Sequence, residues 1–494
     1  RVDKNGTPAT ATYTPTVTPV KPEGIPAKST DIQGKVQTGK PEFKPGNPEV
    51  PMDEEVPATF EDGQTTKTVD KVGTYTVAKD GTVTFTPEKT FTGEAPAVTV
   101  KRVDKNGTPV TATYTPTVTE VVPTAKESET KDIQGAVQKS PVVFDVKDEE
   151  DKSTVNFDRG DERVELNKST LTLVNAAGEK VNEVVIANEG KYVLKDGVIE
   201  FTPEKQFVGK ATSVTVQVED VNGKVATTKY TPEVVGVQPT ATPAETTDIQ
   251  GVPQKGLPEF LGGRVSINGV EKIVPIDETK GLELTNPETG EKGDVITVPG
   301  EGKYEVNNGV VVFTPEPQFT GKAKGINVTR VDMNGTPVTA KYTPTVTPIK
   351  PTGENVTSTD IQGKVQEGTP VFTEGDKRVP IEITDKKPAK FIVGGKEVDV
   401  TEIPATKEGK EVGKYTLDKN TGKVTFTPNK DFIGTPDSAT VQVQDKNGTP
   451  ATATYTPTVT PVKPTGENVT STDIQGKVQT GKPEFKPGNP EVPM

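Results

Sequence analysis

Apolar and polar residues alternate along short segments of this chain, with a period of two. In residues 214–218 three valines alternate with polar residues, which is the pattern of a half-buried β-strand. An Asp-Val-Asn-Gly string at 220–223 separates this segment from a second alternating run that ends at Tyr230. Asn-Gly between two such runs predicts a β-hairpin with a type I′ turn, in which two residues have positive φ. In the second run we expect an inward face of Ala226, Thr228 and Tyr230 and an outward face of Thr227 and Lys229.

Other short segments also predict strands. The segment 82–85 ends near Pro87, which cannot donate a ladder hydrogen bond, and Gly93 then allows a turn that returns Phe91 to the core. The Thr-Val alternation at 456–464 predicts a last strand whose prolines blunt an exposed sheet edge. No capped amphipathic segment is long enough for a helix. The pattern therefore predicts an all-β fold made of antiparallel Ig-like β-sandwiches.

The same strings recur along the chain in one order. Tyr-Thr-Pro and Asp-Ile-Gln-Gly each occur five times, in steps of 101, 116, 112 and 113 residues. Asp-x-Asn-Gly occurs five times, and Phe-Thr-Pro-x-x-x-Phe-x-Gly occurs four times between them. Four motifs in a fixed order indicate tandem repeats of one structural unit. The first residues of D-I-Q-G are Asp31, Asp132, Asp248, Asp360 and Asp473, and those of Y-T-P are Tyr13, Tyr114, Tyr230, Tyr342 and Tyr455.

The spacings predict where the repeats begin and end. The distance from Y-T-P to the next D-I-Q-G is 18 residues at all five junctions, whereas the first half of each unit varies in length. We therefore expect an elongated array with a constant joint. Its fragments at the two ends, which lack partner strands, are not expected to fold reliably. The predicted division is 1–19 for the end of a preceding repeat, 20–120, 121–236, 237–348 and 349–461 for four complete repeats, and 462–494 for the start of a following repeat.

Composition narrows the class of protein. The chain has no Cys, His or Trp, 92 Gly and Pro residues together, and a formal charge of −13. The missing cysteines exclude a disulfide framework and thiolate metal sites, and the negative charge argues against nucleic-acid binding. The sequence contains no run of 18 apolar residues, so no membrane span is predicted. We expect no nucleic acid, membrane or cofactor among the partners, which leaves the neighbouring repeats of the same chain and surface ligands of the whole protein.

Each candidate site has a simpler structural interpretation. D-x-N-G offers oxygen ligands for Ca²⁺, but it lacks the spacing of an EF-hand loop, and turn chemistry explains it better. The N-G-T strings at Asn5, Asn106, Asn334 and Asn447 match glycosylation acceptors because the turn already requires Asn-Gly. The acidic run at 148–151 occurs in one repeat only and is best explained as a solvated loop.

Covalent and catalytic chemistry have little support. A Lys–Asn isopeptide bond in every repeat needs a recurring core lysine, and the aligned Lys89, Lys205 and Lys430 are replaced by Pro317 in the third repeat. Without His or Cys, catalysis would depend on Ser–Lys or paired carboxylates, and the recurring acids lie in turn strings. We therefore predict no enzyme and no catalytic, cofactor or metal residues.

The unit resembles the CshA-type fibril repeats of streptococcal fibrillar adhesins. The matching strings are G-x-Y, F-T-P-x-x-x-F-x-G, D-K-N-G-T and Y-T-P-T-V-T-P, followed by T-D-I-Q-G-x-V-Q, and they span essentially the whole chain. The resemblance implies a secreted adhesin anchored to a Gram-positive cell wall by regions outside this sequence. It also implies a fibril of repeats that holds a separate adhesive region away from the cell.

Three functions remain open at this point. The preferred hypothesis is a structural stalk. In the second hypothesis, the repeats themselves bind host or bacterial ligands through the variable first half of each unit. The third is an array of cadherin-like domains stiffened by calcium.

Overall fold

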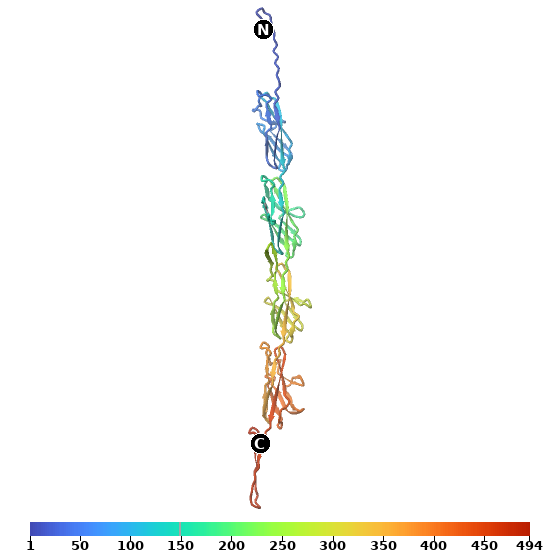
Figure 1. Cartoon of the computed structure of the whole chain (residues 1–494). Helices are drawn as coiled ribbons and strands as arrows, with labels where there is room; N and C mark the ends of the chain where they lie inside the picture. Colours follow the sequence, from blue (N-terminus) through green and yellow to red (C-terminus); the bar gives the residue numbers. More distant parts are fainter. Residues whose placement is uncertain (148–149) are drawn as a thin grey trace. The chain divides into compact units, whose positions relative to one another are not determined.

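The computed structural model describes residues 1–147 and 150–494, and these residues form β-strands without any helix (Figure 1). Accordingly, no helix in the described part of the chain could cross a membrane. The residues group into two compact units. The first contains Arg1–Val237 and Arg264–Val274, and the second contains Gln238–Gly263 and Pro275–Met494. Each unit is described by itself.

In the first unit, the first repeat folds into two sheets that enclose a small core. The alternating burial of β10 and β11 follows their alternating sequence, as expected for strands with one face in the core. One sheet has the order β2-β11-β10-β5, with β9 also paired to β11, and the other has the order β3-β8-β7-β6. The strands are β1 (Glu23–Ile25), β2 (Ala27–Ile32), β3 (Gln37–Gly39), β4 (Glu42–Lys44), β5 (Thr59–Phe60), β6 (Thr66–Val69), β7 (Gly73–Val77), β8 (Val83–Pro87), β9 (Gly93–Glu94), β10 (Val98–Val103) and β11 (Pro109–Thr119).

The second repeat has the same plan with a longer first half. Its sheets have the orders β13-β23-β22-β16-β17, with β21 paired to β23, and β12-β15-β14-β20-β19-β18. The first unit also contains a two-stranded sheet of β28 (Gly263–Ile267) and β29 (Val270–Val274). The other strands are β12 (Thr124–Lys126), β13 (Ser128–Ile133), β14 (Gln138–Phe144), β15 (Val155–Asp158), β16 (Leu166–Val174), β17 (Lys180–Val181), β18 (Glu183–Ile186), β19 (Gly190–Lys195), β20 (Val198–Pro203), β21 (Gly209–Lys210), β22 (Val214–Asp220) and β23 (Val225–Val235).

In the second unit, the third repeat has sheets of order β25-β37-β36-β30-β31, with β35 paired to β37, and β26-β34-β33-β32. A separate pair joins β24 to β27. The strands are β24 (Thr240–Thr242), β25 (Ala244–Ile249), β26 (Gln254–Gly256), β27 (Glu259–Leu261), β30 (Glu283–Thr285), β31 (Lys292–Gly293), β32 (Val295–Val298), β33 (Gly302–Asn307), β34 (Val310–Pro315), β35 (Gly321–Lys322), β36 (Ile326–Val331) and β37 (Pro337–Thr347).

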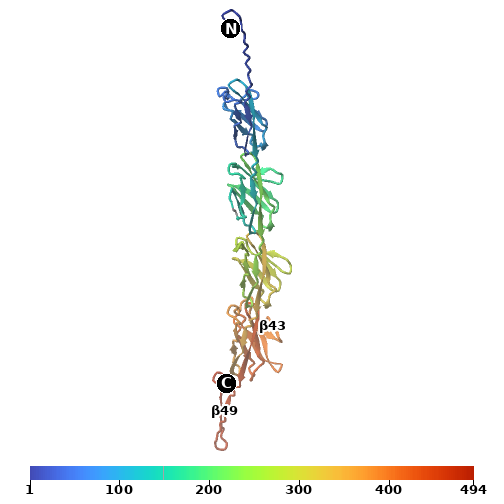
Figure 2. The same ribbon diagram turned by 45° about the horizontal axis from the view of Figure 1, so that its top comes forward.

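The fourth repeat has sheets of order β39-β48-β47-β42-β43 and β40-β46-β45-β44, with the pair β38-β41. In the C-terminal fragment, β49 pairs with β50 and nothing else, and β43 and β49 are labelled in Figure 2. The strands are β38 (Thr352–Glu354), β39 (Val356–Ile361), β40 (Gln366–Gly368), β41 (Val371–Thr373), β42 (Lys390–Val393), β43 (Lys396–Val398), β44 (Glu402–Lys407), β45 (Lys410–Leu417), β46 (Val424–Pro428), β47 (Ala439–Gln444), β48 (Pro450–Thr460), β49 (Thr465–Glu467) and β50 (Glu484–Lys486).

The prediction of all-β sandwiches is confirmed, with three corrections of detail. Most strand pairs are antiparallel, but β2 pairs with β11 in parallel, and the equivalent pair recurs in the other three repeats. The Y-T-P strand lies between two partners, so the prediction that its prolines blunt an exposed edge is wrong. Pro116 faces Ser29 within the parallel ladder, and its carbonyl accepts a hydrogen bond from Ala95 N at 2.9 Å.

The predicted hairpin at 214–230 forms as β22 and β23, but its turn is not type I′. Ala226 and Tyr230 are buried, Thr228 is half-buried, and Thr227 and Lys229 are exposed, as expected. In the turn only Gly223 has positive φ, at 86°. This is the geometry of a type I turn followed by a left-handed glycine. Type I′ geometry, with two successive positive φ values, occurs at Asn268-Gly269 and Asn308-Gly309.

The core of each repeat is built from aromatic rings that both sheets contribute. Tyr192 and Phe201 lie on one sheet with ring centroids 4.6 Å apart, and Tyr230 on the other sheet meets Tyr192 edge-on at 5.9 Å. Valines of β22 fill the space around them. The tyrosine and first phenylalanine of the recurring G-x-Y and F-T-P strings therefore form the centre of the sandwich.

A hydrogen-bond network makes it possible to bury the tyrosine of Y-T-P. The Tyr114 hydroxyl lies 2.6 Å from Ser29 Oγ, which donates to Gln37 Oε1 at 2.5 Å. Gln37 Nε2 in turn donates to the Thr117 carbonyl at 3.0 Å. Equivalent networks surround Tyr230, Tyr342 and Tyr455. The network explains why the second glutamine of T-D-I-Q-G-x-V-Q recurs, since a buried polar group needs a partner.

We expect the repeats to unfold in alkali through these tyrosines. Burial raises the pKa of Tyr75 and of Tyr230 to about 12, from an ordinary value of 10.0. The raised pKa stabilises the fold while the phenol is neutral, below about pH 10, and this stabilisation is lost as the pH rises through about 12. Phenolate absorbance and the loss of strand circular dichroism should therefore rise together above pH 10. Complete ionisation near pH 10 with unchanged circular dichroism would contradict the expectation.

Candidate functional site: the joint between repeats

The D-I-Q-G turn closes the end of β2. Gln33 N donates to the Thr119 carbonyl at 2.9 Å, and Lys35 N donates to the Ile32 carbonyl at 3.2 Å. Gly34 has φ 77°, a left-handed conformation that favours glycine. The buried Gln33 side chain donates from Nε2 to the backbone carbonyl of Lys89 at 2.8 Å. The turn is therefore fixed at both its main chain and its side chain.

The same glutamine contact recurs in all four repeats. The acceptors after Lys89 are the backbone carbonyls of Lys205 at 3.0 Å, Pro317 at 2.9 Å and Lys430 at 3.2 Å. Because the glutamine binds a main-chain atom, proline can replace lysine at this position. The side chains of the three aligned lysines are exposed, so they are not the core lysines that an isopeptide bond requires.

The asparagine of the next repeat docks onto this turn. In the first unit, Asn222 Nδ2 donates to the Gln33 carbonyl at 3.3 Å, and in the second unit Asn447 Nδ2 donates to the Gln250 carbonyl at 2.9 Å. The approach is close, since a Cβ on Gly34 would lie 2.3 Å from Asn222 Oδ1, and one on Gly251 would lie 1.9 Å from Asn447 Oδ1. D-I-Q-G and D-x-N-G are thus the two sides of one joint.

Burial of the asparagine depends on this docking. Asn222 is 6% exposed. Asn106 occupies the same turn position of the first repeat, has no docked D-I-Q-G turn in this structure, and is exposed. The glycines that follow have nearly the same φ, 86° at Gly223 and 80° at Gly107, so the turns themselves are alike. The joint, and not the turn, buries the asparagine.

An ion pair accompanies each docked joint. The aspartate of D-I-Q-G pairs with a cation from the following repeat or from the β28–β29 hairpin, in Asp31–Arg163 at 2.9 Å, Asp132–Lys272 at 2.7 Å and Asp248–Arg378 at 2.9 Å. The polarity is reversed between the fourth repeat and the C-terminal fragment, where Lys364 pairs with Glu491 at 3.1 Å. The cations of these pairs are partly exposed to solvent, which screens the attraction and keeps the contribution of each pair small.

The β28–β29 hairpin adds an apolar contact. Ile267 and Val274 pack with Ile133 and Val237 in one small buried cluster. A joint without this cluster depends on the hydrogen bonds of the asparagine and on the ion pair. Such a joint orients neighbouring repeats without fusing them into one core.

The comparison with known families decides what kind of repeat this is. The family described as "surface adhesin CshA repetitive domain" matches this chain five times, at residues 19–118, 120–234, 236–346, 348–459 and 461–494. The chain belongs to the CshA repetitive-domain family. CshA repeats are parts of a surface adhesin, so this chain is part of a cell-surface protein, and the family is one of adhesin repeats and not of enzymes.

Other comparisons add only distant structural likenesses. No curated protein matches the chain. Protocadherin gamma B2 extracellular cadherin domains 3–6 are 10% identical, with 89% of this chain and 98% of that chain covered and a TM-score of 0.27. The I9–I11 tandem of titin is 11% identical, with 69% of this chain and 97% of that chain covered and a TM-score of 0.26. A tetra-tandem repeat in the extending region of a large adhesion protein is 15% identical, with 88% of this chain and 99% of that chain covered and a TM-score of 0.25.

The aspartate of D-x-N-G acts within its own turn in this CshA array. Asp104 Oδ1 accepts hydrogen bonds from Asn106 N at 2.9 Å and Thr108 N at 2.8 Å. Its Oδ2 is buried without a hydrogen-bond partner, which costs roughly 1–3 kcal/mol that the turn must offset. Within residues 1–147 and 150–494, no three His, Cys, Asp or Glu side chains come together as a metal site would require. The geometry therefore supports turn chemistry at this string.

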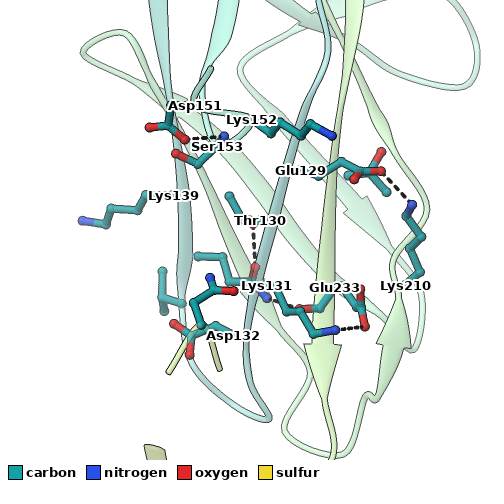
Figure 3. A pocket seen from close by; sticks show the side chains of 14 residues that line it. Glu129, Thr130, Lys131, Asp132, Lys139, Asp151, Lys152, Ser153, Lys210 and Glu233 are labelled. Atoms are coloured by element: carbon teal, nitrogen blue, oxygen red, sulfur yellow. Dashed lines mark hydrogen bonds and ion pairs between the residues drawn. The ribbon is translucent and has the colours of Figure 1, made fainter. Parts of the chain in front are cut away.

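A shallow groove of about 560 Å³ lies in the second CshA repeat, between its first half and strands β21 and β23 of its second half (Figure 3). Its charged side chains pair with each other, as in Lys131–Glu233 at 2.8 Å and Lys210–Glu129 at 2.7 Å. Of the predicted acidic run, Asp148 and Glu149 lie outside the described residues. Asp151 accepts a hydrogen bond from Ser153 N at 2.8 Å, and hydrogen bonds from Ser153 lower its pKa. The groove therefore presents paired charges.

Sequence reasoning identified the two strings of the joint but not their contact. The contact leaves no fixed spacing, since Gln33 and Asn222 are 189 residues apart whereas Gln250 and Asn447 are 197 apart. The cations Arg163, Lys272 and Arg378 were missed because they lie in the first half of each repeat, whose length varies, so no fixed spacing relates them to D-I-Q-G.

Proposed function

We propose that this chain is the repetitive stalk of a surface adhesin, which holds a separate adhesive region away from the cell. The recurrence of one docking contact, Asn222 on Gln33 and Asn447 on Gln250, carries the proposal. A stalk needs a repeatable joint more than it needs a pocket. We also propose four complete repeats, at 20–120, 121–236, 237–348 and 349–461. Other regions of the protein would anchor it to a Gram-positive cell wall, and these residues would carry no enzymatic, metal or cofactor chemistry.

Small-angle scattering of the whole chain tests the stalk. The longest strands have 11 residues, so a repeat is expected to extend about 36 Å along its strands, and a stalk of four repeats joined end to end about 140 Å. A rod of that length has a radius of gyration of about 40 Å, whereas a compact protein of this size has one of about 23 Å. A value near the compact limit would refute the stalk.

A second candidate function is ligand binding by the repeats themselves. It is favoured by the groove of Figure 3, whose lining includes Asp151 and Ser153 from the half of the repeat that varies in length. In that case, arrays immobilised on a surface would capture host or bacterial surface molecules, and exchange of the second repeat's first half would change which molecule is captured. Equal capture by both arrays would exclude this function for the groove.

A further inference from the structure

The Asn-Gly pair of D-x-N-G is chemically reactive as well as structural. In an Asn-Gly sequence, the glycine backbone nitrogen can attack the asparagine Cγ, forming an N–Cγ bond and releasing ammonia. Water then opens the cyclic imide at one of its two carbonyls and leaves aspartate or isoaspartate. The reaction needs no enzyme and no reagent except water. It does need a side chain that is free to rotate and accessible to solvent.

The joint removes both conditions. Asn222 is held between two parts of the preceding turn, with its Nδ2 on the Gln33 carbonyl at 3.3 Å and its Oδ1 close against Gly34. Its 6% exposure keeps water from Cγ. Asn447 makes the same contact with the Gln250 carbonyl but is half-buried, and a further hydrogen bond from Gln318 Nε2 to the Asn447 carbonyl at 2.5 Å fixes its main chain.

We propose that the Asn-Gly pair of each D-x-N-G turn is a deamidation site that the joint protects, and that its conversion releases the joint. A new carboxylate at Asn222 would place a negative oxygen against the Gln33 carbonyl in a nearly buried position. A hydrogen bond would become a repulsion, and an uncompensated charge would be left in the joint. The chemistry is independent of whether the array serves as a stalk.

The chain contains its own controls for the first half of this proposal. Asn106 has the same turn as Asn222 without a docked partner, and Asn268 and Asn308 are exposed Asn-Gly pairs in hairpins of another type. The whole chain is incubated in mildly alkaline buffer and mapped by peptide mass spectrometry. We expect Asn106, Asn268 and Asn308 to convert at least about tenfold faster than Asn222 and Asn447, which corresponds to a joint opening cost of about 1.4 kcal/mol. Conversion of Asn222 at the rate of Asn106 would overturn the protection.

Two variants test whether each joint protects its own asparagine. Arg163→Ala removes the ion pair to Asp31, and Arg378→Ala removes the pair to Asp248. The first should accelerate conversion of Asn222 alone, and the second that of Asn447 alone. Acceleration of both sites by either variant, or of neither by its own variant, would overturn the proposal.

The release of the joint is tested by Asn222→Asp, with Asn106→Asp as the matched control. The chain has no cysteine, so two introduced cysteines carry spin labels on the first and second repeats without background. We expect a broader distribution of the distance between the two labels for Asn222→Asp and an unchanged one for Asn106→Asp. Hydrogen exchange within the sheets of the first and second repeats should be the same in both variants. An unchanged distribution for Asn222→Asp would show that deamidation does not release the joint.

Discussion

Replacing Phe201 with alanine should lower the stability of the second repeat by about 3–5 kcal/mol. The ring is fully buried and lies 4.6 Å from Tyr192 at the centre of the sandwich. A core this small has few side chains that could move into the cavity. Hydrogen exchange followed by mass spectrometry measures the loss in the whole chain, because it resolves the opening of each repeat separately.

The matched control for this substitution is Thr202→Ala. Thr202 follows Phe201 on the same strand and faces solvent, so its replacement should change stability by less than about 0.5 kcal/mol. Exchange in the fourth repeat, which has its own core, should be unchanged in both variants. A cost below about 1 kcal/mol for Phe201→Ala, or faster exchange throughout the fourth repeat, would contradict this account of separate cores.

Replacing Gly251 with alanine should loosen the joint between the third and fourth repeats while both remain folded. The new Cβ would lie 1.9 Å from Asn447 Oδ1, so the asparagine must swing away and lose its hydrogen bond to the Gln250 carbonyl. Spin labels on the third and fourth repeats should then show a wider distance distribution.

Gly363→Ala separates the loss of the joint from backbone strain. Gly363 has φ 80° against 78° at Gly251, so alanine is strained to the same degree at both positions, at about 1–2 kcal/mol. No atom lies near a Cβ at Gly363, since no D-x-N-G turn is docked there. If the two substitutions have the same effect on the distance between the third and fourth repeats, the close contact with Asn447 does not hold the joint.

Much of the fold could be predicted because local patterns determine it. Alternation of Val and Thr gave the strands, and the burial of Ala226 and Tyr230 followed from the period of two. The role of the Y-T-P strand could not be predicted in the same way. Proline usually avoids central strands, yet the strand that carries Pro116 has a neighbour on each side. One of these neighbours is the parallel strand β2, in which Ser29, the partner of Pro116, lies about 87 residues earlier in the chain. Pairing over such a distance leaves no local signal.

For the joint too, one part could be predicted from the sequence and another could not. Asn-Gly predicted a tight turn, and turns form at all the D-x-N-G strings of the four repeats, although only the glycine adopts positive φ. That the Asn222 side chain crosses to the preceding repeat depends on how two folded repeats meet, which no pattern within one repeat encodes. The interpretation of D-x-N-G as a turn was therefore correct and incomplete.

Both recurring contacts of the joint end on main-chain oxygens: the glutamine binds a carbonyl of its own repeat, and the asparagine binds a carbonyl of the preceding one. Every residue type supplies that acceptor, so repeats whose side chains have diverged remain interchangeable neighbours. The ion pair, which has Asp–Arg polarity at Asp31 and Lys–Glu polarity at Lys364, and the apolar cluster of the β28–β29 hairpin are side-chain contacts that differ from joint to joint.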